Sequence, residues 1–167
     1  MKLFGDRLPA ADAALVREHL GGRPTVLAWA ETADGIAVAL PDRLLVRRGD
    51  GWEELPWDDV LSGGWDDDAL ALRWRRMSTS QESSVDLIDP KSLPEVFRER
   101  VEATILVQQV VHASPGRAIT LTARRSLGDA ATSIRWTAHP APGVRMEGET
   151  LAYAERALAR LRAEYEF

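Results

Sequence analysis

The sequence has no cysteine, only two lysines and no long hydrophobic run. Without cysteine, neither disulfides nor thiolate metal sites are available, which is compatible with a reducing compartment. The longest apolar stretch, residues 105–111, is interrupted by Gln108 and Gln109 and is far shorter than the ~20 residues that a membrane-spanning helix needs. The N-terminal residues 1–7 contain no apolar stretch typical of a signal peptide. We therefore expect a cytoplasmic protein that does not associate with membranes.

Residue patterns that indicate catalysis or metal binding are also missing. The three histidines, His19, His112 and His139, show none of the spacings of metal sites or catalytic triads. His19 and His112 lie near the expected C-terminal ends of helices, where the helix dipole favours a positive charge. The positions of His19 and His112 are thus explained by helix stability and not by chemistry. We therefore expect no catalytic residue and no cofactor.

A group of aspartates is the one feature that could attract a metal ion. Its members are Asp58, Asp59, Asp66, Asp67 and Asp68. Carboxylates at two neighbouring turns are the oxygen ligands that Ca²⁺ and Mg²⁺ prefer, but the spacing does not match an EF-hand loop. Aspartates beside glycines are more often solvated turns, and we expect no metal site here.

The charge is small overall and unevenly distributed. The net charge of -5 argues against general binding to nucleic acids or anionic membranes. Residues 1–113 carry 13 basic and 20 acidic side chains, net -7, whereas residues 114–167 carry 8 basic and 6 acidic ones, net +2. The preference for arginine over lysine is typical of GC-rich bacterial genomes, so the number of arginines is not evidence for phosphate binding.

The residue pattern in the first two-thirds of the chain predicts one helix followed by many short strands. Residues 8–20 read as a helix, with Pro9 in its first turn and Gly21-Gly22 at its end. Turn signals then separate seven predicted strands, at residues 25–31, 36–40, 43–48, 52–57, 60–65, 69–75 and 84–88. Seven short strands in a row indicate an antiparallel arrangement.

A second helix is predicted after these strands. Ser92 and Glu95 have the spacing of a capping box, and Pro94 suits the first turn. We expect the helix to continue to about His112. Its second half, Thr104 to Val111, is apolar nearly all round, so it must be covered by the rest of the chain or by another copy.

The last fifty residues predict a small unit of their own. Strands are expected at residues 118–124 and 133–138, joined by a turn at Leu127–Asp129. A final helix opens at Thr150. Its apolar stripe consists of Leu151, Ala154, Leu158, Leu161 and Tyr165. Such a stripe would pack against a sheet or a partner helix.

The order of these elements resembles a known family. Residues 41–48, PDRLLVRR, followed by residues 52–60, WEELPWDDV, are similar to the consecutive strands of bacterial and GRAM-type pleckstrin-homology-like domains. The resemblance implies an α+β fold: a seven-stranded antiparallel barrel or roll capped by a helix, with a C-terminal β-hairpin and helix added. The expected organisation is an N-terminal helix or lid (1–24), a pleckstrin-homology-like domain (25–113) and an appended ββα unit (114–167) packed on the same core.

The resemblance also implies a binding or scaffolding role. Members that bind phosphoinositides carry lysines and arginines around the first hairpin turn, where they pair with phosphates. Here that turn, residues 31–35, contains Glu31 and Asp34 and no base. We therefore do not expect phosphoinositide binding.

Tryptophans provide the first candidate binding surface. Five of the six lie in the predicted seven-strand region, where aromatic residues usually belong to the core. Trp52, Trp57 and Trp65 could instead form an exposed patch near Pro56 that binds a proline-rich or aromatic peptide.

Arginines of the predicted C-terminal hairpin provide the second candidate. Arg124 and Arg135 are expected to point away from the inward set that contains Ile119 and Ile134. A basic outer face could bind an acidic partner, an RNA or a second subunit, although a solvated surface with local ion pairs is the commoner outcome.

These observations favour a non-enzymatic binding or assembly module that acts through protein–protein contacts. The alternative is a small-ligand-binding protein or small enzyme with a site between the barrel and the C-terminal unit. Self-association as a dimer is expected, through either residues 105–111 or the stripe from Leu151 to Tyr165. A protein partner cannot be named from the sequence, and nucleic acid is not an expected one.

Overall fold

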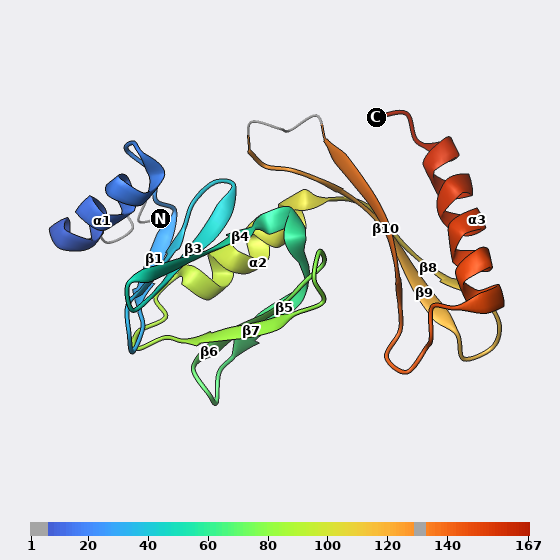
Figure 1. Cartoon of the computed structure of the whole chain (residues 1–167), viewed down its shortest axis with the longest axis horizontal. Helices are drawn as coiled ribbons and strands as arrows, with labels where there is room; N and C mark the ends of the chain where they lie inside the picture. Colours follow the sequence, from blue (N-terminus) through green and yellow to red (C-terminus); the bar gives the residue numbers. More distant parts are fainter. Residues whose placement is uncertain (1–6, 129–132) are drawn as a thin grey trace. The chain divides into compact units, whose positions relative to one another are not determined.

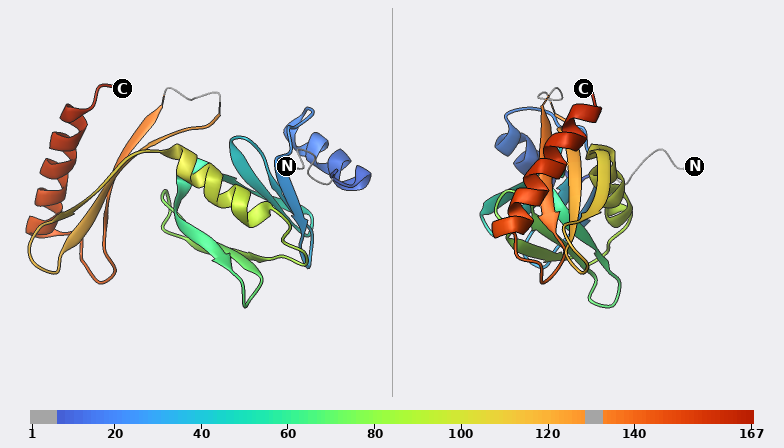
Figure 2. Two further views of the ribbon diagram at one scale, coloured as in Figure 1. Left: turned by 180° about the vertical axis from the view of Figure 1, so that it is seen from behind. Right: turned by 90° about the vertical axis from the view of Figure 1, so that its right-hand side faces the viewer.

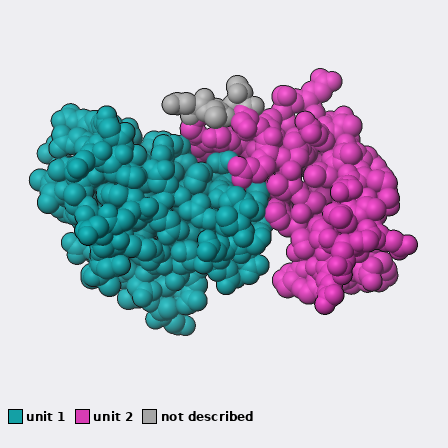
Figure 3. Space-filling view, in the orientation of Figure 1, with its two compact units in different colours: residues 1–103 teal, residues 104–167 magenta. Residues whose placement is uncertain are grey.

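A computed structural model describes residues 7–128 and 133–167 of the chain. The chain divides into two compact units, unit 1 (Met1–Ala103) and unit 2 (Thr104–Phe167), which are coloured separately in Figure 3. The described strands form three antiparallel sheets and are accompanied by helices, which confirms the α+β class. Hydrogen bonds between these strands do not close any of the sheets into a barrel. Nowhere in residues 7–128 and 133–167 is there a helix with the length and hydropathy to cross a membrane.

Unit 1 contains the seven strands expected from the sequence (Figure 1). Helix α1 (Ala10–Leu20) precedes a four-stranded sheet of β1 (Ala28–Glu31), β2 (Ile36–Ala39), β3 (Arg43–Arg48) and β4 (Gly51–Pro56). A short 3₁₀ turn, η1 (Trp57–Asp59), leads into a three-stranded sheet of β5 (Val60–Asp66), β6 (Ala71–Arg76) and β7 (Glu82–Asp86). Neighbouring strands in each sheet are consecutive in sequence, so both sheets are simple meanders.

The four-stranded sheet is buried on both faces. Ile36 and Val38 of β2 pack in one cluster with Val16 of α1, so the N-terminal helix lies against that face. On the opposite face, Leu44 is paired with Ala39 and with Leu55, and all three are fully buried. Cross-strand partners share a face, which explains why β2 is a continuous apolar run rather than an alternating one.

Helix α2 (Leu93–Thr104) packs against both sheets of unit 1, between which it lies in Figure 1. The ring of Phe97 meets the ring of Trp57 edge-on, with 5.7 Å between the centroids. Phe97 also lies beside Gly63 of β5, where an added Cβ would come within 3.0 Å of the phenyl ring and 2.8 Å of the Arg73 carbonyl oxygen. Glycine at position 63 therefore permits a close approach between β5, β6 and α2.

Substitution of Gly63 and of its neighbour Gly64 tests the close packing of β5, β6 and α2. We expect Gly63→Ala to lower the free energy of unfolding by about 1–3 kcal/mol, because the methyl group forces a shift of the backbone or of Phe97. Gly64→Ala is the matched control, since a Cβ there meets no atom within 4 Å. Urea unfolding followed by tryptophan fluorescence reports mainly on unit 1. Equal stability of the two variants would contradict the packing described.

The predicted long helix from Ser92 to His112 is wrong in its second half. Helix α2 ends at Thr104, and residues Ile105–His112 form strand β8, which pairs with the following strand. The segment is rich in β-branched residues, namely Ile105, Val107, Val110 and Val111, which fit a pleated sheet better than a helix. His112 consequently lies at the end of a strand and not at a helix C-terminus.

Unit 2 is a three-stranded sheet covered by one helix, and thus contains one strand more than the predicted hairpin and helix. Strand β8 (Ile105–His112) pairs with β9 (Ala118–Arg125), which pairs with β10 (Ile134–Pro140). Of the turn predicted at 127–129, Asp129 lies outside the described residues. The boundary between the compact units falls after residue 103, earlier than the predicted boundary after residue 113, because β8 belongs to the second sheet.

Helix α3 (Gly148–Glu164) covers one face of this sheet (Figure 2). Its residues Ala154 and Leu161 are buried against Ile119 and Leu121 of β9, and Leu158 packs against the same cluster. Three of the five residues of the predicted apolar stripe are therefore covered within unit 2, whereas Leu151 and Tyr165 are exposed.

Candidate functional site

The three tryptophans proposed as a patch occupy different environments. Trp57 is fully buried, and its Nε1 donates a hydrogen bond to the Leu40 carbonyl at 2.9 Å. Trp52 is partly buried beneath α1, stacked on His19 with 5.0 Å between the ring centroids. Trp65 is partly exposed, and its Nε1 donates to Asp67 at 3.1 Å. The exposed-patch interpretation is therefore wrong for Trp57, which belongs to the core.

Arg124 and Arg135 lie directly opposite each other on β9 and β10. Both are on the sheet face away from Ile119 and Leu121, as alternation predicted. Arg124 is only 5% exposed and donates to the Thr104 hydroxyl at 3.3 Å. Arg135 is exposed. The expected basic outer face thus includes Arg135, whereas Arg124 contributes little accessible charge.

Asp59 and Asp66, one from each of the two turns, accept hydrogen bonds from the protein itself. Asp59 is 5% exposed and accepts from the Ser78 amide and hydroxyl, both at 2.8 Å, and from Arg76 at 3.1 Å. Asp66 accepts from the Ala69 amide at 3.0 Å. Within the described residues, no group of three or more histidine, aspartate or glutamate side chains is placed to hold a metal ion.

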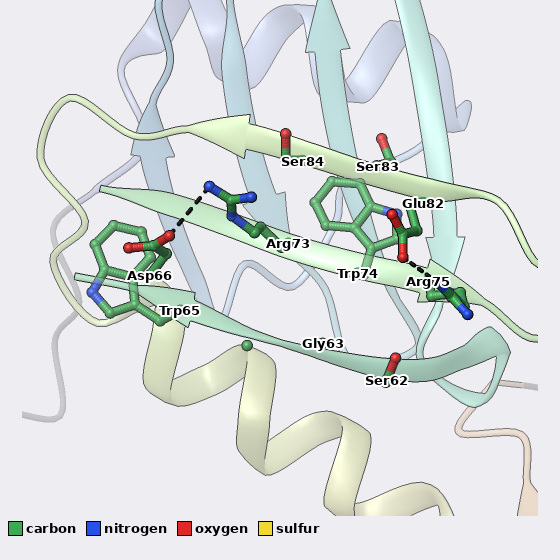
Figure 4. Close-up of a pocket in the computed structure, with 11 residues that line it drawn as sticks. Ser62, Gly63, Trp65, Asp66, Arg73, Trp74, Arg75, Glu82, Ser83 and Ser84 are labelled. Carbon is green, nitrogen blue, oxygen red and sulfur yellow. Dashed lines mark hydrogen bonds and ion pairs between the residues drawn. The ribbon is translucent and has the colours of Figure 1, made fainter. Parts of the chain in front are cut away.

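A polar concavity on the three-stranded sheet of unit 1 has a volume of about 510 Å³ (Figure 4). Figure 4 shows Arg73 turned toward Asp66, with which it forms an ion pair at 3.2 Å. Arg75 is paired with Glu82 in the same way. The charges that line this concavity therefore neutralise one another. Exposed pairs of this kind contribute about 0–1 kcal/mol each, so the surface suits a neutral polar ligand better than a charged one.

A second concavity, of about 570 Å³, lies at α1, the start of β1 and the turn before α2. Four cationic side chains line it: Arg7, Arg17, Arg23 and Lys91. The described lining residues include no acidic side chain. This site was not predicted from the sequence, because Lys91 is far along the chain from the three arginines around α1 and no local motif connects them.

No protein-family model matches the sequence, and no curated protein or solved structure is significantly similar to it.

Among the histidines, only His139 has a buried ring nitrogen without a hydrogen-bond partner in the described structure, its Nε2. Burial, and secondarily the positive charge of Arg124, lower the pKa of His139 from the ordinary value of 6.5. The folded structure therefore favours the neutral form of the His139 imidazole. His19, in contrast, lies within 3.0 Å of Glu54, and His112 is exposed.

His139 makes the stability of unit 2 dependent on pH. As the pH falls below 6.5, the unfolded chain binds a proton at His139 that the folded chain does not, so the free energy of unfolding decreases. Denaturation followed by circular dichroism at about pH 7.5 and about pH 5.5 measures this loss. We expect His139→Gln to show a smaller loss than the wild type and the exposed control His112→Gln to show the wild-type loss. Equal pH dependence of all three chains would contradict a neutral, buried His139.

Proposed function

We propose that the chain is a non-enzymatic binding and assembly module that acts through protein–protein contacts, and that unit 1 is a pleckstrin-homology-like module. The order of elements supports this assignment of unit 1. A meander of four strands is followed by a meander of three and then by a helix that packs between the sheets. The Trp57–Phe97 contact ties the link between the sheets to that helix.

The observation that carries the assembly role is the free edge of β8. This strand pairs with β9 and, among the described strands, with no other. Natural edge strands are usually protected by lysines, prolines or inward-pointing charges. Residues Ile105–Val111 contain none of these, and Gln108, Gln109 and Val110 are exposed. An edge strand of eight residues without protection is a template for pairing with another strand.

A second copy of the chain is the partner that fits this edge best. Antiparallel pairing of β8 with the β8 of a second copy is compatible with two-fold symmetry and would form one continuous sheet of six strands. No like charges would meet along residues 105–111. The other element predicted to dimerise, the stripe of α3, already packs on β9 within unit 2.

Sedimentation velocity over about a hundredfold range of concentration tests this assembly. We expect the wild-type chain to move from monomer to dimer mass, and Val110→Lys to remain a monomer, because Val110 is 54% exposed and a lysine on the edge opposes pairing. The matched control is Leu151→Lys, which places the same charge at a 39% exposed leucine of α3. A wild-type chain that stays at monomer mass up to tens of micromolar, or a Val110→Lys variant that still dimerises, would refute it.

A further inference from the structure

The cationic concavity of unit 1 has a charge opposite to that of the whole chain. The protein has a net charge of -5, yet the four charged side chains among the described lining residues, Arg7, Arg17, Arg23 and Lys91, are all positive. Within the described structure, neither the Arg17 nor the Arg23 side chain makes an ion pair or a hydrogen bond. The positive charges of Arg17 and Arg23 repel each other, and an anion bound beside both guanidinium groups would reduce that repulsion.

Apolar side chains also line the concavity. Leu8, Val26 and Trp29 contribute to its wall. Trp29 is only 8% exposed, and the Lys91 ammonium lies 3.6 Å from the centroid of its ring. Lys91 holds this position with a left-handed backbone, φ 49°, that non-glycine residues seldom adopt. The site therefore presents two guanidinium groups beside a fixed aromatic and aliphatic surface.

The size and composition fit a small molecule. A volume of about 570 Å³ lies within the range of about 300–1,000 Å³ that is usual for ligand pockets, which combine apolar walls with a few polar groups. Guanidinium groups match the oxygens of phosphate and carboxylate groups and bind them through charge-assisted hydrogen bonds.

We propose that this concavity is a binding site for an amphiphilic anion, with the anionic head group between Arg17 and Arg23 and the apolar body against Leu8, Val26 and Trp29. The site is separate from the β8 edge and adds a ligand-binding activity to the assembly role. The head group could belong to a soluble metabolite or to a lipid, and the same arginines would bind it in either case.

Isothermal titration calorimetry with hexyl phosphate at low ionic strength tests the proposal. We expect a dissociation constant of about 1 mM or below, with weaker binding of inorganic phosphate, which lacks the apolar body, and of hexanol, which lacks the charge. Added salt should weaken binding, because it screens the arginines. The double variant Arg17→Gln/Arg23→Gln should bind about tenfold more weakly or not at all, since charge-assisted hydrogen bonds are lost.

Two matched variants separate loss of the site from loss of the fold. Arg17→Lys/Arg23→Lys retains the charges and should bind measurably. Arg98→Gln removes an exposed arginine of α2 that does not line the concavity and should bind like the wild type. Circular dichroism spectra of all variants should match that of the wild type.

Co-sedimentation with vesicles of phosphatidylcholine and phosphatidic acid distinguishes the source of the head group. Sedimentation that depends on Arg17 and Arg23 would identify a lipid-borne anion, and binding of hexyl phosphate alone would identify a soluble one. Both outcomes support the site. A wild-type chain that binds neither hexyl phosphate nor the vesicles, or a glutamine double variant that binds as tightly as the wild type, would overturn it.

Discussion

Trp57 lies where β4 passes into β5, and its buried indole connects the main parts of unit 1. Its Nε1 donates to the carbonyl of Leu40, which follows β2, and its ring packs edge-on against Phe97 of α2. Two residues later, Asp59 accepts hydrogen bonds from Arg76, the last residue of β6, and from Ser78. The short turn η1 thus joins both sheets and the helix through one aromatic and one carboxylate side chain. Burial of a complete indole contributes several kcal/mol, so the arrangement of the two sheets depends strongly on this residue.

Local signals predicted the strands of unit 1 well, and the end of α2 poorly. Strand β3 was expected and observed at residues 43–48, because Pro41-Asp42 and Gly49-Asp50-Gly51 mark its two ends. The start of α2 was similarly marked by Ser92 and Pro94. Between Thr104 and Ile105, however, no glycine, proline or cap separates helix from strand. Pairing with β9 decides the structure of β8, and a long-range contact of this kind is not visible in local periodicity.

The candidate sites could be predicted only in part, because they too depend on contacts between residues that are distant in the sequence. Sequence alternation correctly placed Arg124 and Arg135 on the face away from the Ile119 side of the sheet, but it could not show that Arg124 is buried. The cationic concavity was not predicted at all. Arg17 looks like an ordinary surface residue of a helix, and Lys91 like a residue of a loop. Only the fold brings α1, the start of β1 and the turn before α2 around one space.

The position of α1 has a thermodynamic consequence. This helix covers an apolar face of the four-stranded sheet, yet Val16 is its one fully buried side chain among residues 10–20. A helix of eleven residues is marginal by itself in water, so its attachment depends on few contacts. Because residues of both α1 and β1 line the cationic concavity, any molecule that binds to both elements is thermodynamically linked to the attachment of the helix. Occupancy would hold α1 on the sheet and keep Ile36 and Val38 away from water, whereas an empty concavity would not add to the free energy of detaching the helix.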